Sequence, residues 1–188
     1  MPRRNLLAIL AFLVAGEGSA ESWNDQLSRT IELPSHQWLE QLRGSPEVTL
    51  DAFTTDGCSG GMSSLWAFFA ETYPAFAEGL GGQPPWEECC VSHDRAYHVG
   101  GESPEAEASF EARLEADRVL RECVRVTESE KDSILREEYA LSETQVRAAY
   151  AAIAAAMYQA VRLGGGPCTG LPWRWGYGYP QCWQKQGE

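Results

Sequence analysis

Residues 89–97 read Cys-Cys-Val-Ser-His-Asp-Arg-Ala-Tyr, and adjacent cysteines of this kind can tie one segment to two others. Four of its side chains recur at i, i+3, i+4 and i+7, so they share one face of a helix: Cys90, His93, Asp94 and Tyr97. A helix that only packs against a core carries apolar residues at these positions. A thiol, an imidazole, a carboxylate and a phenol on one face predict a disulfide-anchored catalytic helix.

The N-terminus has the features of a secretory signal. Two arginines precede the nine apolar residues of 6–14, and small residues follow up to Ala20, where we expect cleavage. Nine apolar residues are too few to span a bilayer, which takes about 20. We therefore expect a signal peptide at 1–20 and a single domain at 21–188, secreted or periplasmic. An uncleaved membrane anchor is the alternative, although no later segment has the length and apolarity to span.

Composition narrows the class of protein further. Six cysteines, an even number, all lie after the expected signal and favour three disulfides in an oxidising compartment. Their number alone leaves the pairing open. The net charge of −12 disfavours nucleic acids and strongly anionic membranes as partners, and it suits cation binding.

The sequence predicts a mostly α fold, because long amphipathic segments dominate and β-branched runs are few. Helices are expected at 64–77, from about 85 to 100, from 104 to about 126, at 128–138 and at 145–163. Ser103 is the expected N-cap of the third of these, and Ser142 opens the last. The segment 21–50 is mixed and polar, with one short amphipathic piece at 38–42. A tail at 164–188 is rich in Gly, Pro and aromatic residues.

Asp117 lies on the helix that follows the catalytic one. The short connection between the two helices favours antiparallel packing. If Cys89 is bonded to Cys123, four residues forward along one helix reach His93 and six back along the other reach Asp117. At about 1.5 Å per residue these steps nearly match. The carboxylate would then meet the imidazole, fix its tautomer and stabilise its charged form.

A glycine-rich turn, Thr-Asp-Gly-Cys-Ser-Gly-Gly at 55–61, supplies a second feature. Glycines let backbone carbonyls converge on one point, and calcium prefers oxygen ligands, carbonyls included. A bond between Cys58 and Cys90 would hold this loop beside Asp94. A base and a metal would then lie together, which is the arrangement needed for metal-assisted attack of water on an ester.

Together these residues resemble the secreted phospholipase A2 family. The resemblance rests on Gly-Cys-Ser-Gly-Gly at 57–61, on Cys-Cys-x-x-His-Asp-x-x-Tyr at 89–97, and on Ala-Asp-Arg at 116–118 with Cys123. It covers at most a third of the mature chain. The Cys-Cys-x-x-His-Asp-x-x-Tyr motif is specific, whereas the glycine loop alone is a weak signal. The chain would be a divergent member, because the β-hairpin wing that the family carries between its two catalytic helices is missing.

The resemblance implies calcium-dependent hydrolysis of the sn-2 acyl ester of phospholipids, with a membrane or micelle interface as the partner. His93 would be the general base, Asp117 would orient it, and Tyr97 would hydrogen-bond near the Asp117 carboxylate. The implied calcium ligands are the Asp94 carboxylate and the carbonyls of Gly57, Ser59 and Gly61. The implied disulfides are Cys58–Cys90 and Cys89–Cys123, which leaves Cys168 with Cys182. No role is assigned to His36 or His98.

Several alternatives stay open at this point. The scaffold could be a non-catalytic, calcium-stabilised module that binds lipid or envelope material, or the aromatic tail could bind polysaccharide. Asp94 could pair with Arg95 or Arg118, and Asp117 could be a solvated helix residue. Asp56 could replace one carbonyl as a calcium ligand, and the cysteines with His93 could instead bind zinc. The aromatic residues at 65–76 and in the tail could contact lipid, although core packing is the simpler interpretation.

Overall fold

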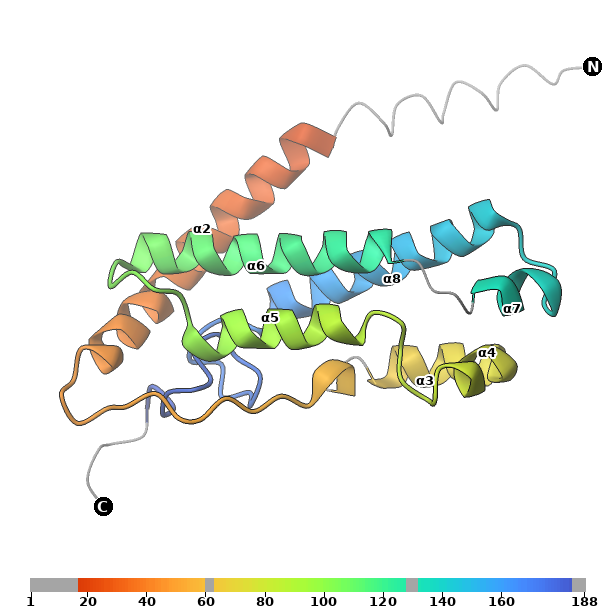
Figure 1. The fold of residues 1–188 in the computed structure, drawn as a ribbon. Coiled ribbons are helices and arrows are strands. Elements are labelled where there is room, and N and C mark those ends of the chain that lie inside the picture. Colours follow the sequence, from red (N-terminus) through yellow and green to blue (C-terminus); the bar gives the residue numbers. More distant parts are fainter. Residues whose placement is uncertain (1–16, 60–62, 128–131, 184–188) are drawn as a thin grey trace, which may run out of the picture.

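The computed structural model describes residues 17–59, 63–127 and 132–183, and these residues form helices and loops without a β-strand (Figure 1). The predicted mostly α fold is therefore confirmed over this part of the chain. The elements, in chain order, are α2 (Glu17–Arg43), the 3-10 turn η1 (Gly57–Ser59), α3 (Ser63–Thr72), α4 (Pro74–Gly79), α5 (Glu87–Val99), α6 (Ala106–Val126), α7 (Asp132–Glu137) and α8 (Glu143–Gly164).

Helix α6 is the centre of the arrangement, because it packs against α8, α5 and α2 (Figure 1). Helices α5 and α6 run antiparallel and are joined by a short connection, as the sequence predicts. On its other side α5 carries η1. The Cys-Cys-x-x-His-Asp helix thus lies between the glycine loop and the helix of Asp117.

The hydrophobic core fixes α8 against α5 and α6. The inward face of α8 repeats at helical spacing, with Val146, Tyr150, Ile153, Met157 and Val161 buried. The helix begins at a capping box in which the Gln145 N–H donates to the Ser142 hydroxyl, and the Ser142 N–H donates to the Gln145 side chain. Ser142 therefore opens this helix as predicted.

The longest helix, α2, is the main correction to the sequence analysis. Its 27 residues include the segment expected to be mixed and polar with a short amphipathic piece. The face that α2 turns to the protein holds buried or partly buried polar residues, Glu32, His36 and Arg43, beside the buried Leu39. The larger apolar residues Leu27, Ile31 and Trp38 of this helix are exposed, so the apolar pattern does not identify the face that packs.

Three predicted helix boundaries also change. The helix expected at 64–77 is divided into α3 and α4, since Pro74 has no N–H to continue the hydrogen-bond ladder. Helix α6 has Glu105 as its N-cap, because the Ser103 hydroxyl accepts from the Glu105 N–H at 3.2 Å in a turn before the helix. The continuation expected at 128–138 is interrupted: α6 ends at Val126, 128–131 lie outside the described residues, and α7 is a separate short helix.

The C-terminal tail folds back over the core instead of extending into solvent. Trp175 is buried, and its indole N–H donates to Ser109 Oγ at 3.0 Å. The backbone N–H groups of Gly176 and Gly178 donate to the Tyr97 and His98 carbonyls at 2.6 and 3.1 Å. The tail therefore docks on the end of α5, which agrees with a packed flap.

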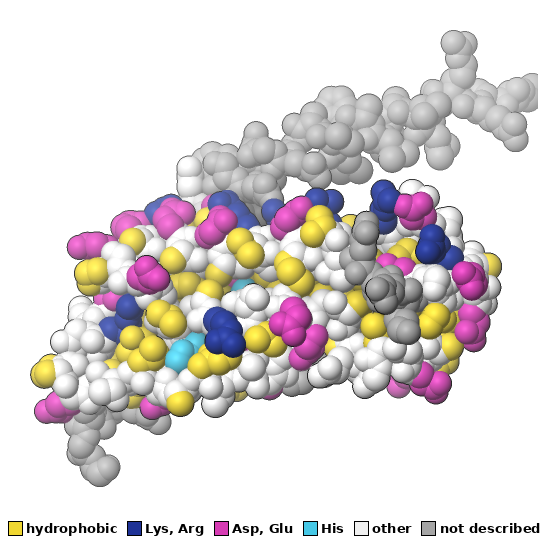
Figure 2. All heavy atoms as spheres, in the orientation of Figure 1, with side chains coloured by type: hydrophobic (Ala, Val, Ile, Leu, Met, Phe, Trp, Pro, Cys, Tyr) yellow, Lys and Arg dark blue, Asp and Glu magenta, His cyan; other side chains and the backbone are white. Residues whose placement is uncertain are grey.

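Three disulfides join the cysteines in the pairs that the resemblance implies: Cys58–Cys90, Cys89–Cys123 and Cys168–Cys182. Because no thiol remains free, the zinc alternative is wrong. Within the described residues, no helix has both the length and the apolar character needed to cross a membrane. The expected signal lies mostly outside the described residues, and Ala20 falls within α2. Acidic and basic side chains are interspersed over the face shown in Figure 2, so the acidity is not gathered there in one patch.

Candidate active site

His93 of α5 and Asp117 of α6 face each other across the helix pair. His93 Nε2 lies 2.8 Å from Asp117 Oδ1, and the Tyr97 hydroxyl donates to the same oxygen at 2.7 Å. The Cys89–Cys123 disulfide joins the same two helices. Asp117 is fully buried and His93 is 8 % exposed. The structure brings the three predicted residues together, and the interpretation of Asp117 as a solvated helix residue is wrong.

The charge state of Asp117 follows from its surroundings. Burial alone would raise the pKa of Asp117, but a hydrogen bond from His93 and the charge of Arg113 outweigh it and lower that pKa. An ionised carboxylate only accepts hydrogen bonds, so Nε2 of His93 carries the shared proton. This tautomer leaves Nδ1 as the ring nitrogen that can take a proton. The arrangement suits a general base that is oriented by a carboxylate.

Two arginines complete the surroundings of Asp117, and the sequence analysis does not identify them. Arg162 Nη1 donates to Asp117 Oδ2 at 3.0 Å, and Arg113 Nη2 lies 3.8 Å from the same oxygen. Both guanidinium groups also bind Glu32 of α2. Arg113 stands one helical turn before Asp117, a spacing that could have indicated it. Arg162 and Glu32 reach the site from helices distant in sequence, and no local pattern indicates them.

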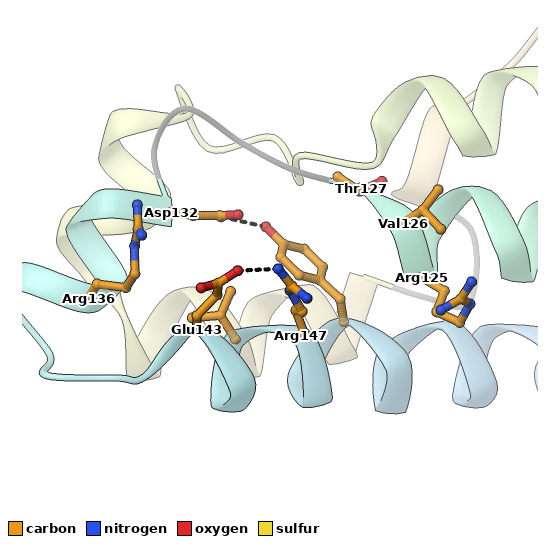
Figure 3. Close-up of a pocket in the computed structure, with 9 residues that line it drawn as sticks. Arg125, Val126, Thr127, Asp132, Arg136, Glu143 and Arg147 are labelled. Carbon is orange, nitrogen blue, oxygen red and sulfur yellow. Dashed lines mark hydrogen bonds and ion pairs between the residues drawn. The ribbon is translucent and has the colours of Figure 1, made fainter.

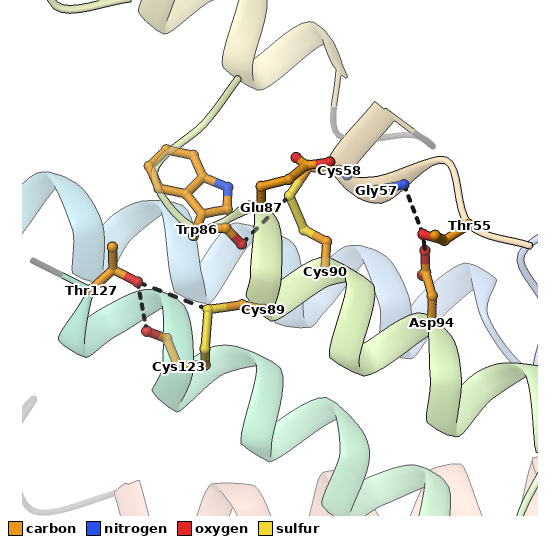
Figure 4. The surroundings of a disulfide bond; sticks show 10 residues. All are labelled: Thr55, Gly57, Cys58, Trp86, Glu87, Cys89, Cys90, Asp94, Cys123 and Thr127. Atoms are coloured by element: carbon orange, nitrogen blue, oxygen red, sulfur yellow. Dashed lines mark hydrogen bonds between the residues drawn. A yellow bond between two sulfur atoms is a disulfide. The ribbon is translucent and has the colours of Figure 1, made fainter. Parts of the chain in front are cut away.

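Asp94 lies on the side of α5 that faces the loop before η1. Its Oδ2 accepts from the Thr55 hydroxyl at 2.5 Å, and the Gly57 N–H donates to that hydroxyl at 2.9 Å (Figure 4). Burial raises the pKa of Asp94, and the nearby negative charges of Asp56 and Glu87 add to the rise. The Asp94 carboxylate is therefore in a region of surplus negative charge.

The salt bridges considered for Asp94 do not form. The Arg95 guanidinium lies 4.4 Å from the centre of the Phe53 ring, and Arg118 Nη2 pairs with Asp25 at 2.7 Å. Asp94 is thus held beside the loop by Thr55 and not by a neighbouring arginine.

The loop around η1 is shaped by contacts with Glu87 and by one disulfide. Gly57 has φ +62°, a left-handed conformation that favours glycine, and the Glu87 carboxylate fills the space where a Cβ would lie. The Cys58 N–H donates to Glu87 Oε2 at 3.3 Å, while the bond from Cys58 to Cys90 ties the loop to α5 (Figure 4). Glu87 is a further residue of this site that the sequence analysis does not identify.

A calcium ion fits the chemistry of this corner. Within the described part of the chain, no three His, Cys, Asp or Glu side chains could hold a metal ion by themselves, so calcium would also need backbone carbonyls. Of the implied carbonyl ligands, Gly57 and Ser59 form η1 beside α5, and Gly61 lies outside the described residues. Surplus carboxylates and neighbouring oxygen donors suit a hard cation.

A cavity of about 390 Å³ opens next to His93 and Asp94. The remaining side of this cavity is apolar and comes from α6, α8 and the tail, through Leu120, Met157, Val161, Leu163 and Trp173. The cavity therefore places an apolar wall opposite the imidazole. Its volume falls within the usual range of about 300–1,000 Å³ for small-molecule sites.

A second cavity of about 290 Å³ adjoins the first. It is lined by Thr54, Thr55, Asp56, Asp94, Pro172, Trp173 and Tyr177. Trp173 lines both cavities, and its ring packs so closely on Gly164 that a Cβ there would overlap it. Trp173 therefore borders both an apolar and a more polar space.

A third hollow, of about 400 Å³, lies between α6, α7 and α8 (Figure 3). There the Tyr150 hydroxyl donates to Asp132 Oδ1 at 2.8 Å, and Arg147 pairs with Glu143. None of the predicted site residues lines it. This hollow is therefore separate from the candidate active site.

Comparisons with known proteins find no matching family model, and no curated protein or solved structure is significantly similar to this chain.

Proposed function

We propose that this protein hydrolyses the sn-2 acyl ester of phospholipids in a calcium-dependent reaction, as a divergent phospholipase A2-like enzyme. The observation that carries the proposal is the buried His93–Asp117 pair, hydrogen-bonded at 2.8 Å beside the Asp94 carboxylate and a largely apolar cavity. A polar catalytic pair next to an apolar wall suits an ester that is attached to an acyl chain. The three disulfides support a secreted or periplasmic location.

In this proposal each residue has one chemical task. His93 takes a proton from water at Nδ1, and the water oxygen attacks the ester carbon. The bond from that carbon to the alcohol oxygen of the lysophospholipid then breaks, and His93 returns the proton to this leaving oxygen. Asp117 keeps the ring in that tautomer and stabilises the imidazolium that forms, while Tyr97 fixes Asp117 by donating to Oδ1 at 2.7 Å. The acyl chain lies against Leu120, Met157 and Val161.

The Asp94 carboxylate and the carbonyls of Gly57, Ser59 and Gly61 would hold calcium. When bound, the ion supplies positive charge to stabilise the negative oxygen that develops at the ester carbon. Asp56 would contribute negative charge to the same corner, because it lines both cavities with Asp94.

Asp94→Asn is expected to remove calcium binding and hydrolysis together. In the unaltered protein, calcium at about ten times its dissociation constant should raise stability by about 1–2 kcal/mol, or roughly 3–6 °C in Tm. The amide loses the charge that binds the ion, so Tm should no longer respond to calcium. The measurement is a calcium titration of Tm and of label release from phospholipid micelles.

The matched control for this experiment is Asp51→Asn, which changes an exposed carboxylate between α2 and η1 that lines neither cavity. It should keep both responses to calcium. A calcium response of Tm without label release in the unaltered protein would favour the non-catalytic lipid- or envelope-binding module. Full calcium dependence in Asp94→Asn would contradict the assignment of Asp94.

Trp173→Ala is expected to change substrate preference. Because Trp173 lines both cavities, its truncation widens them and deletes an apolar wall of the site. We expect KM for a phospholipid with a small head group to rise roughly tenfold with kcat nearly unchanged, and bulkier head groups to be accepted better. Kinetics on micelles of two lipids with different head groups test this, with the exposed Trp183→Ala as control. An unchanged preference would show that Trp173 does not contact substrate.

A further inference from the structure

A buried network of charges connects α2 to the catalytic pair. Glu32 accepts from Arg162 Nη2 at 2.8 Å through one carboxylate oxygen and from Arg113 Nη1 through the other. The same two arginines face Asp117 Oδ2, at 3.0 and 3.8 Å. Arg113 Nε also donates to the Tyr97 hydroxyl at 3.1 Å. One guanidinium group, of Arg113 or of Arg162, thus separates Glu32 from Asp117 Oδ2.

The charges of this network balance only if Glu32 is included. Arg113 and Arg162 bring two positive charges into the interior, where their side chains are 0 % and 8 % exposed. Asp117 neutralises one of them and Glu32 the other. Burial alone would raise the pKa of Glu32, but the neighbouring His36, whose Nε2 lies 3.8 Å from Glu32 Oε2, and the charge of Arg113 outweigh it and lower that pKa. Glu32 is therefore ionised, and the network is neutral when His93 is neutral.

The charge of Glu32 also decides how the two arginines act on Asp117. Without Glu32 the network would hold one uncompensated positive charge in the interior, which is strongly disfavoured. Asp117 would also be drawn toward both arginines and away from His93.

We infer that Glu32 is a positioning residue for the His93–Asp117 pair, which acts through Arg113 and Arg162. The kinetic consequences of this inference rest on the proposed function. The contacts of Glu32 with the two arginines are independent of that function. Glu32 is absent from the described residues that line the cavity, so it has no direct contact with the proposed substrate. Its effect is on the charge and orientation of Asp117.

The attachment of α2 does not depend on Glu32 alone. His36 Nδ1 lies 2.8 Å from Ser109 Oγ, and Arg43 donates to the Gly100 and Gly101 carbonyls at 3.2 and 2.8 Å. Leu39 is buried in a cluster with Trp175. A substitution at Glu32 should therefore leave α2 docked, which makes the effect on the catalytic pair measurable.

The first test is kinetic and uses Glu32→Gln, which keeps the shape and removes the charge. We expect kcat to fall by about tenfold, the lower end of the range for a residue that acts on the reacting group through others, with KM nearly unchanged. The matched control is Glu40→Gln, which breaks the pair with Arg43 on the same helix without touching Arg113 or Arg162. Equal losses in both variants would overturn the inference.

The second test restores the charge balance. Adding Arg162→Gln to Glu32→Gln removes the uncompensated positive charge, so the double variant should have a higher kcat than Glu32→Gln alone. A purely structural role predicts the reverse, because the double variant loses one more hydrogen bond to Asp117. A kcat equal to or below that of the single variant would therefore overturn the inference.

The third test needs no substrate. The proton on His93 Nε2, in its hydrogen bond to buried Asp117, should give a far-downfield NMR resonance that Glu32→Gln shifts or removes and Glu40→Gln leaves in place. An unmoved resonance in Glu32→Gln would overturn the inference even if the protein is an active lipase. Absence of hydrolysis in the unaltered protein would overturn the proposed function alone.

Discussion

His93→Gln is expected to lower kcat for phospholipid hydrolysis by roughly 10³- to 10⁴-fold, the upper part of the range for loss of a general base. The glutamine amide can still donate to Asp117, so the buried carboxylate keeps a partner and the fold should survive. It has no basic nitrogen to replace Nδ1, so water is no longer activated. Initial rates on mixed micelles with saturating calcium, together with Tm in the same buffer, give the measurement.

A control on the same helix separates loss of the base from damage to α5. His98 is also buried, 4 % exposed, but it packs against Phe53 and Tyr177 and does not line the cavity next to His93. His98→Gln should keep most of the activity. Wild-type-like rates in His93→Gln would show that this imidazole is not the base.

Removal of the Cys89–Cys123 disulfide is expected to have the largest effect on stability. The bond joins two cysteines that are 34 residues apart in sequence. Its removal by paired Cys→Ser substitutions frees the chain between them in the unfolded state. In the chain-entropy description this costs about 4 kcal/mol, against a total stability of about 5–15 kcal/mol for a domain. Urea unfolding followed by far-UV circular dichroism measures the loss.

The same substitutions should reduce activity before they unfold the protein. The disulfide lies on the helix pair that carries His93 and Asp117, so loosening it separates the base from its carboxylate. The tail disulfide, Cys168–Cys182, serves as the comparison. Its two cysteines are separated by 14 residues in sequence, and neither lies on α5 or α6. If its removal were the more damaging to kcat, the tail and not the α5–α6 pair would control the geometry of the site.

Local chemistry made part of this site predictable. The spacing of Cys90, His93, Asp94 and Tyr97 gives one helical face in any context, and the offset from Cys89 and Cys123 to the catalytic pair depends only on helix rise. Ser142 and Gln145 form a capping box that can be found in the sequence. These features depend on neighbours a few residues apart.

Other parts depend on contacts between distant helices and leave no local pattern. Glu32 and Arg162 are 130 residues apart and pair only because α2 crosses α6 near the end of α8. The same contacts turn polar side chains inward on α2, while its apolar Leu27 and Ile31 are exposed, so the apolar positions do not identify the packed face. Ser103 fails as the N-cap of α6 since its hydroxyl accepts from the Glu105 N–H in the preceding turn. The sequence allows a serine at such a position either to cap the helix or to form a turn before it, and tertiary packing selects between the two.

The proposed phospholipase activity is tested most directly by which ester bond is cleaved and by whether cleavage depends on calcium. Purified mature protein would be incubated with mixed micelles of phospholipid labelled at the sn-1 or the sn-2 acyl chain, with calcium or with a chelator. We expect release of the sn-2 label in calcium, little release of the sn-1 label, and loss of release in chelator. No release in calcium, or equal release in chelator, would contradict the proposed calcium-dependent phospholipase.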